Sequence, residues 1–432
     1  MPDSSKPELT KVALFSKEYP PDVYGGAGVH VEYLSLALAK IIQMEIRCFG
    51  DQAVDDGALV VRGYKQWDET KIGSDPRFTG AIDAFARSLV MAKDRLDAQL
   101  VHCHTWYTDI GGTIASQLWN IPYVLTIHSL EPLRPWKLEQ LGNAYHLSAW
   151  MERTAIEQAD AIIAVSRETK ADVLRLFDVK PERVHVIHNG IDPVEYRPTP
   201  GTDVLTKYGI DPDRPFLLFV GRITRQKGII HLVNAIPHID PALQIVLCAG
   251  APDTPEIGRE MEEGVAQVAA ERPGVIWIQQ MISRPEVIQL YTNAAVFCCP
   301  SVYEPFGIIN LEAMACETAV VASAVGGIPE VVVPNETGLL VDPGLIPGTF
   351  EPADPAAFST NLAGAINQLA HDPALCARFG RAGRERAVAH FSWDAIAQAT
   401  VALYRAVVEQ RASSSRPPGG LGPPSQASQQ PS

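Results

Sequence analysis

The chain has 432 residues, and its 36 Lys and Arg against 50 Asp and Glu give a formal net charge of −14. A single core rarely grows beyond roughly 250–300 residues, so this length predicts more than one domain. With 46% hydrophobic residues the composition is that of a globular protein, and the acidic balance argues against electrostatic binding to nucleic acid or to an anionic membrane.

In the first half of the chain, short apolar runs rich in β-branched residues alternate with longer amphipathic stretches. Near-continuous apolar strands separated by helical patterns are typical of buried parallel sheets. The predicted strands are 12–16, 45–49, 99–103, 123–127, 161–165 and 184–187.

The second half repeats this alternation, which predicts two doubly wound, Rossmann-like α/β domains rather than the alternative, an eight-fold barrel. Turn formers at 189–193 place the hinge almost midway. We therefore expect a flexible start over 1–10, a first domain over 11–190 and a second over 191–391. The predicted strands of the second domain are 216–220, 244–249, 275–278, 295–299, 319–323 and 339–341.

The end of the chain has two parts. Apolar residues recur at spacings of three and four after Ser392, a good N-cap, and predict a helix over 392–410. Residues 411–432 are rich in Gly, Pro and Ser, and such a segment buries too little apolar surface to order itself, so we expect a disordered tail.

The compartment is predicted from the first residues and the cysteines. Residues 1–10 are polar and unlike a secretory signal, and no apolar run approaches the ~18 residues of a membrane span. The seven cysteines contain no C-x-x-C pair. These features predict buried free thiols and a cytoplasmic protein.

The first segment with a chemical signature covers residues 17–30 and follows the first predicted strand. Gly25 and Gly26 stand just before a helix predicted over 31–41, where backbone N–H groups and the helix dipole favour a phosphate. The segment is neither a dinucleotide fingerprint nor a P-loop, because the third Gly and the Gly-Lys-Ser/Thr are missing. A purely structural turn is the alternative.

A compact cluster of cations occupies residues 220–228, at the carboxyl end of a predicted strand. Open α/β sheets bind ligands at this end of their strands. Arg222 offers a bidentate fork to phosphate oxygens and Lys227 a mobile point charge. The cluster predicts a phosphate site, with a solvated charged turn as the alternative.

The third segment, residues 300–315, also follows a predicted strand. A helix beginning near Gly307 directs the free amides of Gly307 and Ile308 at the same sheet edge. Glu304 then lies in the preceding loop and Glu312 inside the helix, where carboxylates suit sugar hydroxyls. The alternative is that Glu304 caps the helix and Glu312 is solvated.

Two histidines of the first half stand just past predicted strands. His128 and His104, the latter followed by Trp106, occupy ligand-facing strand ends, although a lone histidine is often structural. Asp211 and Asp213 flank a proline and are typical of a turn, so we predict no metal site there.

Together these segments resemble the family-four, nucleotide-sugar-dependent retaining glycosyltransferases, whose two Rossmann-like domains face each other across a deep cleft (the GT-B type). The similarity is greatest to the actinobacterial-type glycogen synthases and α-maltose-1-phosphate synthases, and it extends from about residue 11 to 411. The matching segments are 18–21 with 25–28, 102–107, 128–136, 221–228 and 303–307.

The resemblance implies specific roles. Arg222 and Lys227 hold the donor diphosphate, Glu304 contacts the donor glucose, Glu312 contacts the ribose and His128 lies near glucose C6. The implied catalytic residues are His128, Arg222, Lys227 and Glu304, and the implied donor-binding residues are Gly25, Gly26, Arg222, Lys227, Glu304, Gly307, Ile308 and Glu312.

The expected reaction is the transfer of glucose from ADP-glucose to an α-glucan end or to glucose 1-phosphate, with an α-1,4 link and no metal or other cofactor. The base ADP is inferred from the resemblance alone, and the oligomeric state is left open. Arg134 and Lys137 are candidates for an acceptor phosphate, and His104 and Trp106 for other acceptor contacts. The resemblance also implies that the C-terminal helix crosses back to the first domain.

Two alternatives remain open. A sucrose- or trehalose-forming transferase shares the donor motifs and differs in the loops of the first domain. A non-catalytic nucleotide-binding protein is the other, and the joint presence of Arg222, Lys227, Glu304 and Glu312 argues against it.

Overall fold

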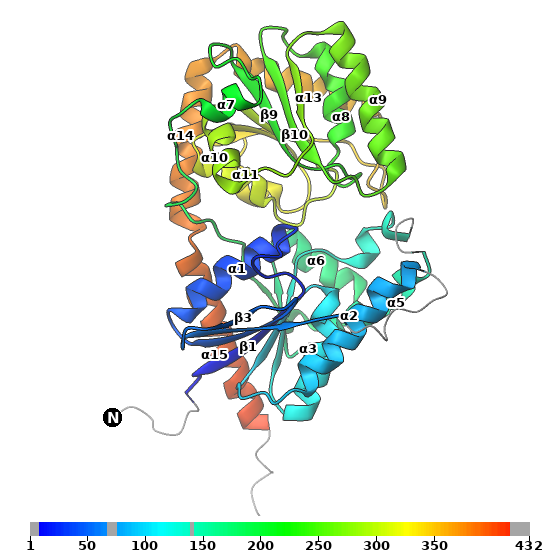
Figure 1. Cartoon of the computed structure of the whole chain (residues 1–432), viewed down its shortest axis with the longest axis vertical. Coiled ribbons are helices and arrows are strands. Elements are labelled where there is room, and N and C mark those ends of the chain that lie inside the picture. Colours follow the sequence, from blue (N-terminus) through cyan, green and yellow to red (C-terminus); the bar gives the residue numbers. More distant parts are fainter. Residues whose placement is uncertain (1–7, 67–75, 139–141, 415–432) are drawn as a thin grey trace, which may run out of the picture.

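The computed structural model describes residues 8–66, 76–138 and 142–414, and these form two α/β halves, each built around a largely parallel sheet (Figure 1). The first half is blue to blue-green and the second green to orange in that view. The fold class predicted from the sequence is confirmed and the eight-fold barrel is wrong, because the strands form two open sheets. Residues 1–7 of the predicted flexible start and 415–432 of the predicted tail lie outside the described residues.

The first sheet has eight strands in the order β3-β4-β2-β1-β5-β6-β7-β8, and only the β3–β4 pair is antiparallel. The six strands predicted in this half are present, but β3 and β4 were not predicted. They lie at one edge of the sheet; β3 is fully exposed and β4 is only partly buried, so neither has the long apolar run of a central strand. The strands are β1 (Lys11–Ser16), β2 (Gln43–Phe49), β3 (Ala53–Asp55), β4 (Leu59–Tyr64), β5 (Val101–His104), β6 (Tyr123–Ile127), β7 (Ala161–Ala164) and β8 (Val184–Val186).

The second sheet has six parallel strands in the order β11-β10-β9-β12-β13-β14. This is a doubly wound order: successive strands are added toward one edge as far as β11 and then toward the other edge from β12, so the order switches between the adjacent strands β9 and β12. Ligands bind at such a switch point. All six predicted strands are present. They are β9 (Phe216–Arg222), β10 (Gln244–Gly250), β11 (Val275–Ile278), β12 (Val296–Cys299), β13 (Ala319–Ser323) and β14 (Gly338–Val341).

Local signals set several helix starts. The Asp354 and Asp372 side chains each accept a hydrogen bond from a first-turn amide, and a proline follows each in the first turn. The helices of the first half are α1 (Gly26–Ala39), α2 (Pro76–Lys93), α3 (Trp106–Trp119), α5 (Ala144–Gln158) and α6 (Arg167–Leu176), with the 3-10 turns η2 (Glu131–Leu133) and η3 (Pro181–Arg183). Those of the second are α7 (Asp203–Lys207), α8 (Ile229–Ala235), α9 (Pro255–Glu271), α10 (Arg284–Asn293), α11 (Ile308–Ala315), α12 (Ile328–Val331), α13 (Pro355–Ala370) and α14 (Pro373–His390), with the turn η4 (Ile236–His238).

Two helix boundaries differ from the prediction. Helix α1 begins at Gly26 rather than at 31; its N-cap, Gly25, has no side chain that could mark the start in the sequence. The C-terminal helix α15 (Trp393–Ser414) continues past 410, so residues 411–414, which were expected to belong to the tail, are helical.

Helix α15 joins the two halves. It follows α14 of the second half and packs on α1, and its buried residues belong to the core of the first half (Figure 1). At the predicted hinge the Ile191 N–H donates to the Phe391 carbonyl at 2.7 Å. The start of α15 is thereby tied to the connection between the sheets. The domain boundary at 190/191 stays a prediction.

The contact between α15 and the first sheet gives a stability prediction. The Tyr404 hydroxyl lies 2.6 Å from His102 Nδ1, and both groups are buried. We expect Tyr404→Phe to lower the free energy of unfolding by about 1–3 kcal/mol, because it leaves a buried ring nitrogen without a partner. Urea unfolding measures this change. Tyr208→Phe is the matched control. The Tyr208 hydroxyl donates to Glu286, and without it this carboxylate still accepts hydrogen bonds from Lys207 and Ser283. An equal loss of stability in both variants would contradict the prediction.

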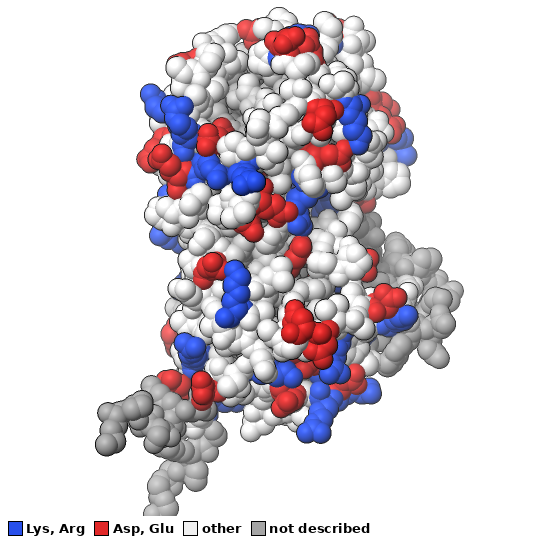
Figure 2. All heavy atoms as spheres, turned by 60° about the vertical axis from the view of Figure 1, so that its left-hand side comes forward, with Lys and Arg blue, Asp and Glu red and all other residues white. Residues whose placement is uncertain are grey.

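The surface carries acidic and basic side chains interspersed over the face in Figure 2, with no single basic patch there. The seven cysteines are free, and six of them are buried. Within the described ranges, no helix has both the length and the apolar character that crossing a bilayer requires.

Candidate functional site

Strand β9 ends at Arg222, at the switch point of the second sheet and facing the first half of the molecule. Its Nη1 lies 2.8 Å from Asp253 Oδ1 and 3.4 Å from the hydroxyl of Tyr24, which belongs to the glycine-rich segment of the first half. The guanidinium also stands 5.1 Å from the centre of the Tyr24 ring. The Arg222 side chain is 32% exposed, so it lies between the two halves and does not extend into bulk solvent.

Lys227 lies in the turn after β9, and its Nζ is 2.6 Å from Glu304 Oε2. Burial disfavours the Lys227 charge, but the Glu304 carboxylate outweighs it, and the net result is a raised pKa. The next residue, Gly228, caps α8 with a φ of 60°. A Cβ at Gly228 would lie 2.1 Å from the Pro300 carbonyl oxygen, so this glycine lets the two loops meet.

Glu304 lies in the loop between β12 and α11, and its carboxylate accepts a hydrogen bond from Ser301 Oγ at 3.2 Å. Only 7% of Glu304 is exposed. Helix α11 begins at Ile308 after Gly307, whose φ is 102°, and no side chain caps this start. The helix start predicted from the sequence is confirmed. The predicted role of its amides as an anion cradle stays a prediction.

Glu312 lies inside α11, where the Tyr291 hydroxyl donates to its Oε2 at 3.1 Å. Burial raises the pKa of Glu312 to about 7, although hydrogen bonds from Tyr291 and Tyr196 act in the opposite direction. Its carboxyl therefore changes charge near neutral pH, unlike an ordinary glutamate.

This titration predicts a pH dependence, provided that Glu312 binds the donor ribose. Above about pH 7 the carboxylate accepts hydroxyl hydrogen bonds as an anion, and below it the group is neutral. We expect the KM for the nucleotide sugar to rise about fivefold from pH 8 to pH 6, because a charged hydrogen bond binds about tenfold better than a neutral one and about a tenth of the group is still charged at pH 6. Initial rates measure it, and Glu312→Gln removes the dependence. A wild-type KM that is flat with pH would contradict the assignment.

The opposite face of the site comes from the start of α1. The Glu18 carboxylate accepts hydrogen bonds from the backbone amides of Tyr24 and Gly25, both at 2.8 Å, and so organises the glycine-rich turn. A Cβ at Gly26 would lie 3.7 Å from Ile308 Cδ1. The N-terminal ends of α1 and α11 therefore meet, as expected for two segments that bind one ligand.

Beside this face lie His128 and His104, which follow β6 and end β5. His104 Nδ1 is 2.9 Å from His128 Nε2, and burial lowers the pKa of both rings far below the usual value. His128 is half-buried and His104 is fully buried. Trp106 is 6% exposed and packs in the core of the first half, a placement that favours a structural role over the predicted acceptor contact.

Arg134 and Lys137 lie beyond His128. Arg134 Nη1 is 3.2 Å from Ser129 Oγ and 3.5 Å from Glu131 Oε1. The pKa of Lys137 is lowered to about 8, chiefly by burial and also by the Arg134 and Arg222 charges, against the opposing Glu131 and Asp253 charges. The candidate acceptor cations thus act within the same electrostatic field as Arg222.

Several contacts of the site were not predicted from the sequence. Glu18 orders the glycine turn, Tyr24 and Asp253 hold Arg222, and Tyr291 holds Glu312. Tyr24 stands inside the glycine-rich segment, which was a usable signal. The sequence around Asp253 and Tyr291 contains no such signal, because the partners of these residues lie in other segments and only the folded chain brings them together.

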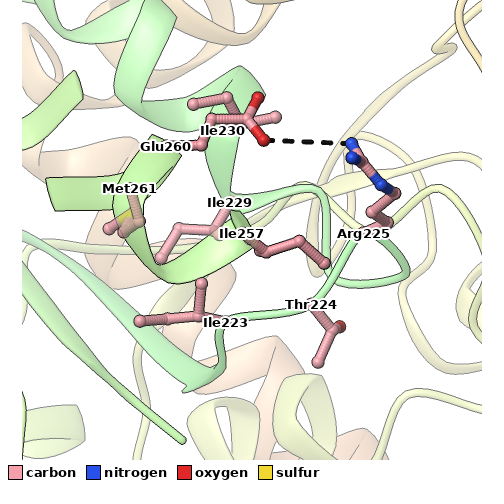
Figure 3. Close-up of a pocket in the computed structure, with 8 residues that line it drawn as sticks. All are labelled: Ile223, Thr224, Arg225, Ile229, Ile230, Ile257, Glu260 and Met261. Atoms are coloured by element: carbon pink, nitrogen blue, oxygen red, sulfur yellow. Dashed lines mark ion pairs between the residues drawn. The ribbon is translucent and has the colours of Figure 1, made fainter. Parts of the chain in front are cut away.

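A small pocket lies behind the cationic turn (Figure 3). It is mostly apolar, with the Arg225 to Glu260 ion pair, 3.9 Å long, at its side. Its volume of about 20 Å³ accommodates about one water molecule, so it cannot take a sugar or a nucleotide. Its lining residues are Ile223, Thr224, Arg225, Ile229, Ile230, Ile257, Glu260 and Met261.

Comparisons with known proteins match both halves. Residues 24–195 match the family described as Glycosyltransferase Family 4, and residues 203–386 match Glycosyl transferases group 1. The alpha-maltose-1-phosphate synthase of Mycolicibacterium smegmatis is 49% identical over 401 residues, which cover 92% of this chain and 99% of the relative. The glycogen synthase of Mycobacterium tuberculosis is 27% identical over 431 residues, with coverages of 92% and 94%. The solved structure of sucrose-phosphate synthase from Thermosynechococcus elongatus has a TM-score of 0.74 at 28% identity and covers 92% and 99% of the two chains.

Proposed function

The chain belongs to the glycosyltransferases of family four, and from this premise we propose that it is a retaining α-1,4-glucosyltransferase that uses ADP-glucose. The observation that carries the proposal is the meeting of Lys227 and Glu304 at the switch point of the second sheet. Lys227 offers an ammonium for the donor diphosphate, and Glu304 offers a carboxylate for the glucose hydroxyls. Lys227 Nζ lies 2.6 Å from Glu304 Oε2.

The leaving diphosphate sets the chemistry. The transition state resembles an oxocarbenium ion departing from a diphosphate, so preorganised positive groups near the leaving oxygen lower the barrier most. Arg222 and Lys227 supply these groups, and the amide ends of α1 and α11 add to them. We propose attack on the same face as the departing phosphate, and trapping of a covalent glycosyl-enzyme would refute this route.

For the acceptor we propose glucose 1-phosphate or the end of an α-glucan. The names of two relatives support these acceptors. The more similar relative is named alpha-maltose-1-phosphate synthase, which supports glucose 1-phosphate, and the more distant one is named glycogen synthase, which supports an α-glucan. The structural neighbour sucrose-phosphate synthase favours a second candidate, a sucrose-forming transferase. Because these enzymes share the donor side, the first-half loops decide between the candidates.

The test incubates the full chain with ADP-glucose, or with UDP-glucose, and with either glucose 1-phosphate or glycogen. Mass spectrometry and linkage analysis identify the product. We expect maltose 1-phosphate or an α-1,4-extended glucan from ADP-glucose. No transfer from ADP-glucose to either acceptor, or a product without a new α-1,4 link, would overturn the proposal.

A linked prediction concerns Arg134 and Lys137. The double change Arg134→Ala, Lys137→Ala is expected to raise the KM for glucose 1-phosphate about tenfold or more and to spare glucan elongation, because only the former acceptor carries a phosphate. Steady-state kinetics with the two acceptors measure this split. An equal loss with both acceptors would reject the phosphate role.

The proposal needs no catalytic metal, because the cationic side chains and helix ends supply the positive charge that the diphosphate requires. It also includes the cytoplasm as the place of the reaction, which the free and mostly buried cysteines support.

A further inference from the structure

Three histidine rings converge behind the face that the first half turns to the second. They come from different elements, His30 from α1, His104 from the end of β5 and His128 from the residue after β6. One ring nitrogen of each lies within 4.8 Å of the others. Among the described residues, no other group of three or more His, Cys, Asp or Glu residues meets this criterion.

Two of these rings carry buried nitrogens that make no hydrogen bond with any described residue, His30 Nε2 and His104 Nε2. The Asn189 Oδ1 atom lies 2.7 Å from His30 Nδ1, and since a carbonyl oxygen only accepts, Nδ1 carries the proton. His30 Nε2 therefore holds a bare lone pair. A histidine whose other nitrogen donates to a carbonyl oxygen is the usual arrangement of a metal ligand.

The other two rings face each other. His104 Nδ1 and His128 Nε2 are 2.9 Å apart. One proton lies between these two nitrogens, and a metal ion would replace this hydrogen bond, with the proton moving to the other nitrogen of its ring. The neighbouring His102 differs, because both of its nitrogens are hydrogen-bonded, to Tyr404 and Thr126. His128 is half-buried and gives the cluster an opening to the site.

We propose that His30, His104 and His128 bind a divalent transition-metal ion of the zinc and cobalt class. Neutral imidazoles are preferred ligands of these ions, and three of them leave a fourth, open position. Metal–nitrogen bonds of ~2.0–2.1 Å place tetrahedral ligand atoms roughly 3.4 Å apart. The nitrogens already lie within 4.8 Å, so small rotations of the rings close the site.

The consequence for activity rests on the proposed function. If His128 stands beside the donor glucose, a metal ion on its ring removes it from that contact, and the ion inhibits transfer. The binding of the metal does not depend on the proposed function, so the two are tested separately.

The binding test uses Co²⁺ on the full chain after treatment with a chelator and its removal. We expect about one equivalent to bind and to give the intense visible absorption of tetrahedral cobalt. His30→Asn and His104→Asn each weaken binding at least ~10-fold. His238→Asn is the matched control, because this histidine is exposed and lies in the second half. Circular dichroism checks that each variant folds, and two independent ligand variants guard against the loss of one.

The proposal is overturned if Co²⁺ does not bind, if its spectrum is octahedral, or if both ligand variants bind it as the wild type does. The second measurement is the ratio of transfer rates with and without Zn²⁺ in each protein. We expect this ratio to be low for the wild type, to be restored by chelator and to approach one for His30→Asn. Tetrahedral cobalt binding with a Zn²⁺-insensitive rate supports the metal site and contradicts the position of His128 in the proposed function.

Discussion

Replacing Lys227 with alanine is expected to lower kcat by about 10²–10³, the usual cost of removing one preorganised donor to a developing negative charge. The ammonium is held 2.6 Å from Glu304 and is 20% exposed, so no solvent cation reproduces its position. The change also leaves the largely buried Glu304 carboxylate with Ser301 as its remaining donor. Initial rates with saturating donor and acceptor measure the loss.

The matched control for this prediction is Lys207→Ala. Lys207 is also paired with a glutamate, Glu286, but its side chain is 56% exposed and lies in α7, away from the switch point. It is expected to keep full kcat, because exposed ion pairs contribute little. The rate of donor hydrolysis without acceptor is expected to show the same pattern, with Lys207→Ala equal to the wild type and Lys227→Ala much slower. A Lys227→Ala rate within tenfold of the wild type would remove Lys227 from the proposed catalytic group.

The second large effect is expected from Gly228→Ala. At a φ of 60°, a residue with a Cβ destabilises the fold by about 1–2 kcal/mol relative to glycine. Here the added Cβ would also lie 2.1 Å from the Pro300 carbonyl oxygen. The cationic turn must then move away from the loop that carries Glu304. A misplacement of about 1 Å costs roughly 10² in rate, so we expect kcat to fall about a hundredfold. Steady-state kinetics and thermal unfolding measure the two parts of the effect.

Gly209→Ala separates the clash from the strain. Gly209 has a φ of 70°, similar to that of Gly228, but no atom of the described chain lies within 4 Å of an added Cβ. It is expected to lose the same modest stability and to keep its kcat. Equal activity in the two variants would show that the approach of Gly228 to Pro300 does not position Lys227.

The fold followed from the sequence because its signals are local. Each central strand is an apolar run, and the alternation with helical patterns specifies parallel strands. The exceptions are instructive: β3 and β4 lie at an exposed edge, where no continuous apolar run is required. The start of α1 was placed too late, since a glycine N-cap gives no side-chain signal.

The site was predicted in part, for the same reason. Arg222, Lys227 and Glu304 stand at the ends of strands that the sequence reveals, and the topology brings those ends to one edge. The partners that hold them were not predicted. Asp253 follows β10 and Tyr24 belongs to the other half, and the sequence around each of them gives no indication that it contacts Arg222.

The sequence alone therefore determined the two Rossmann-like sheets, the strand-end cations and carboxylates, and the family resemblance, because hydrophobic periodicity and short motifs are properties of neighbouring residues. Only the tertiary structure decided which charged side chains form ion pairs and how far the pKa of Glu312 is raised above that of an ordinary glutamate. It alone also brings His30 next to His104 and His128. Burial and pairing arise between segments far apart in the chain, and they exist only when the chain is folded.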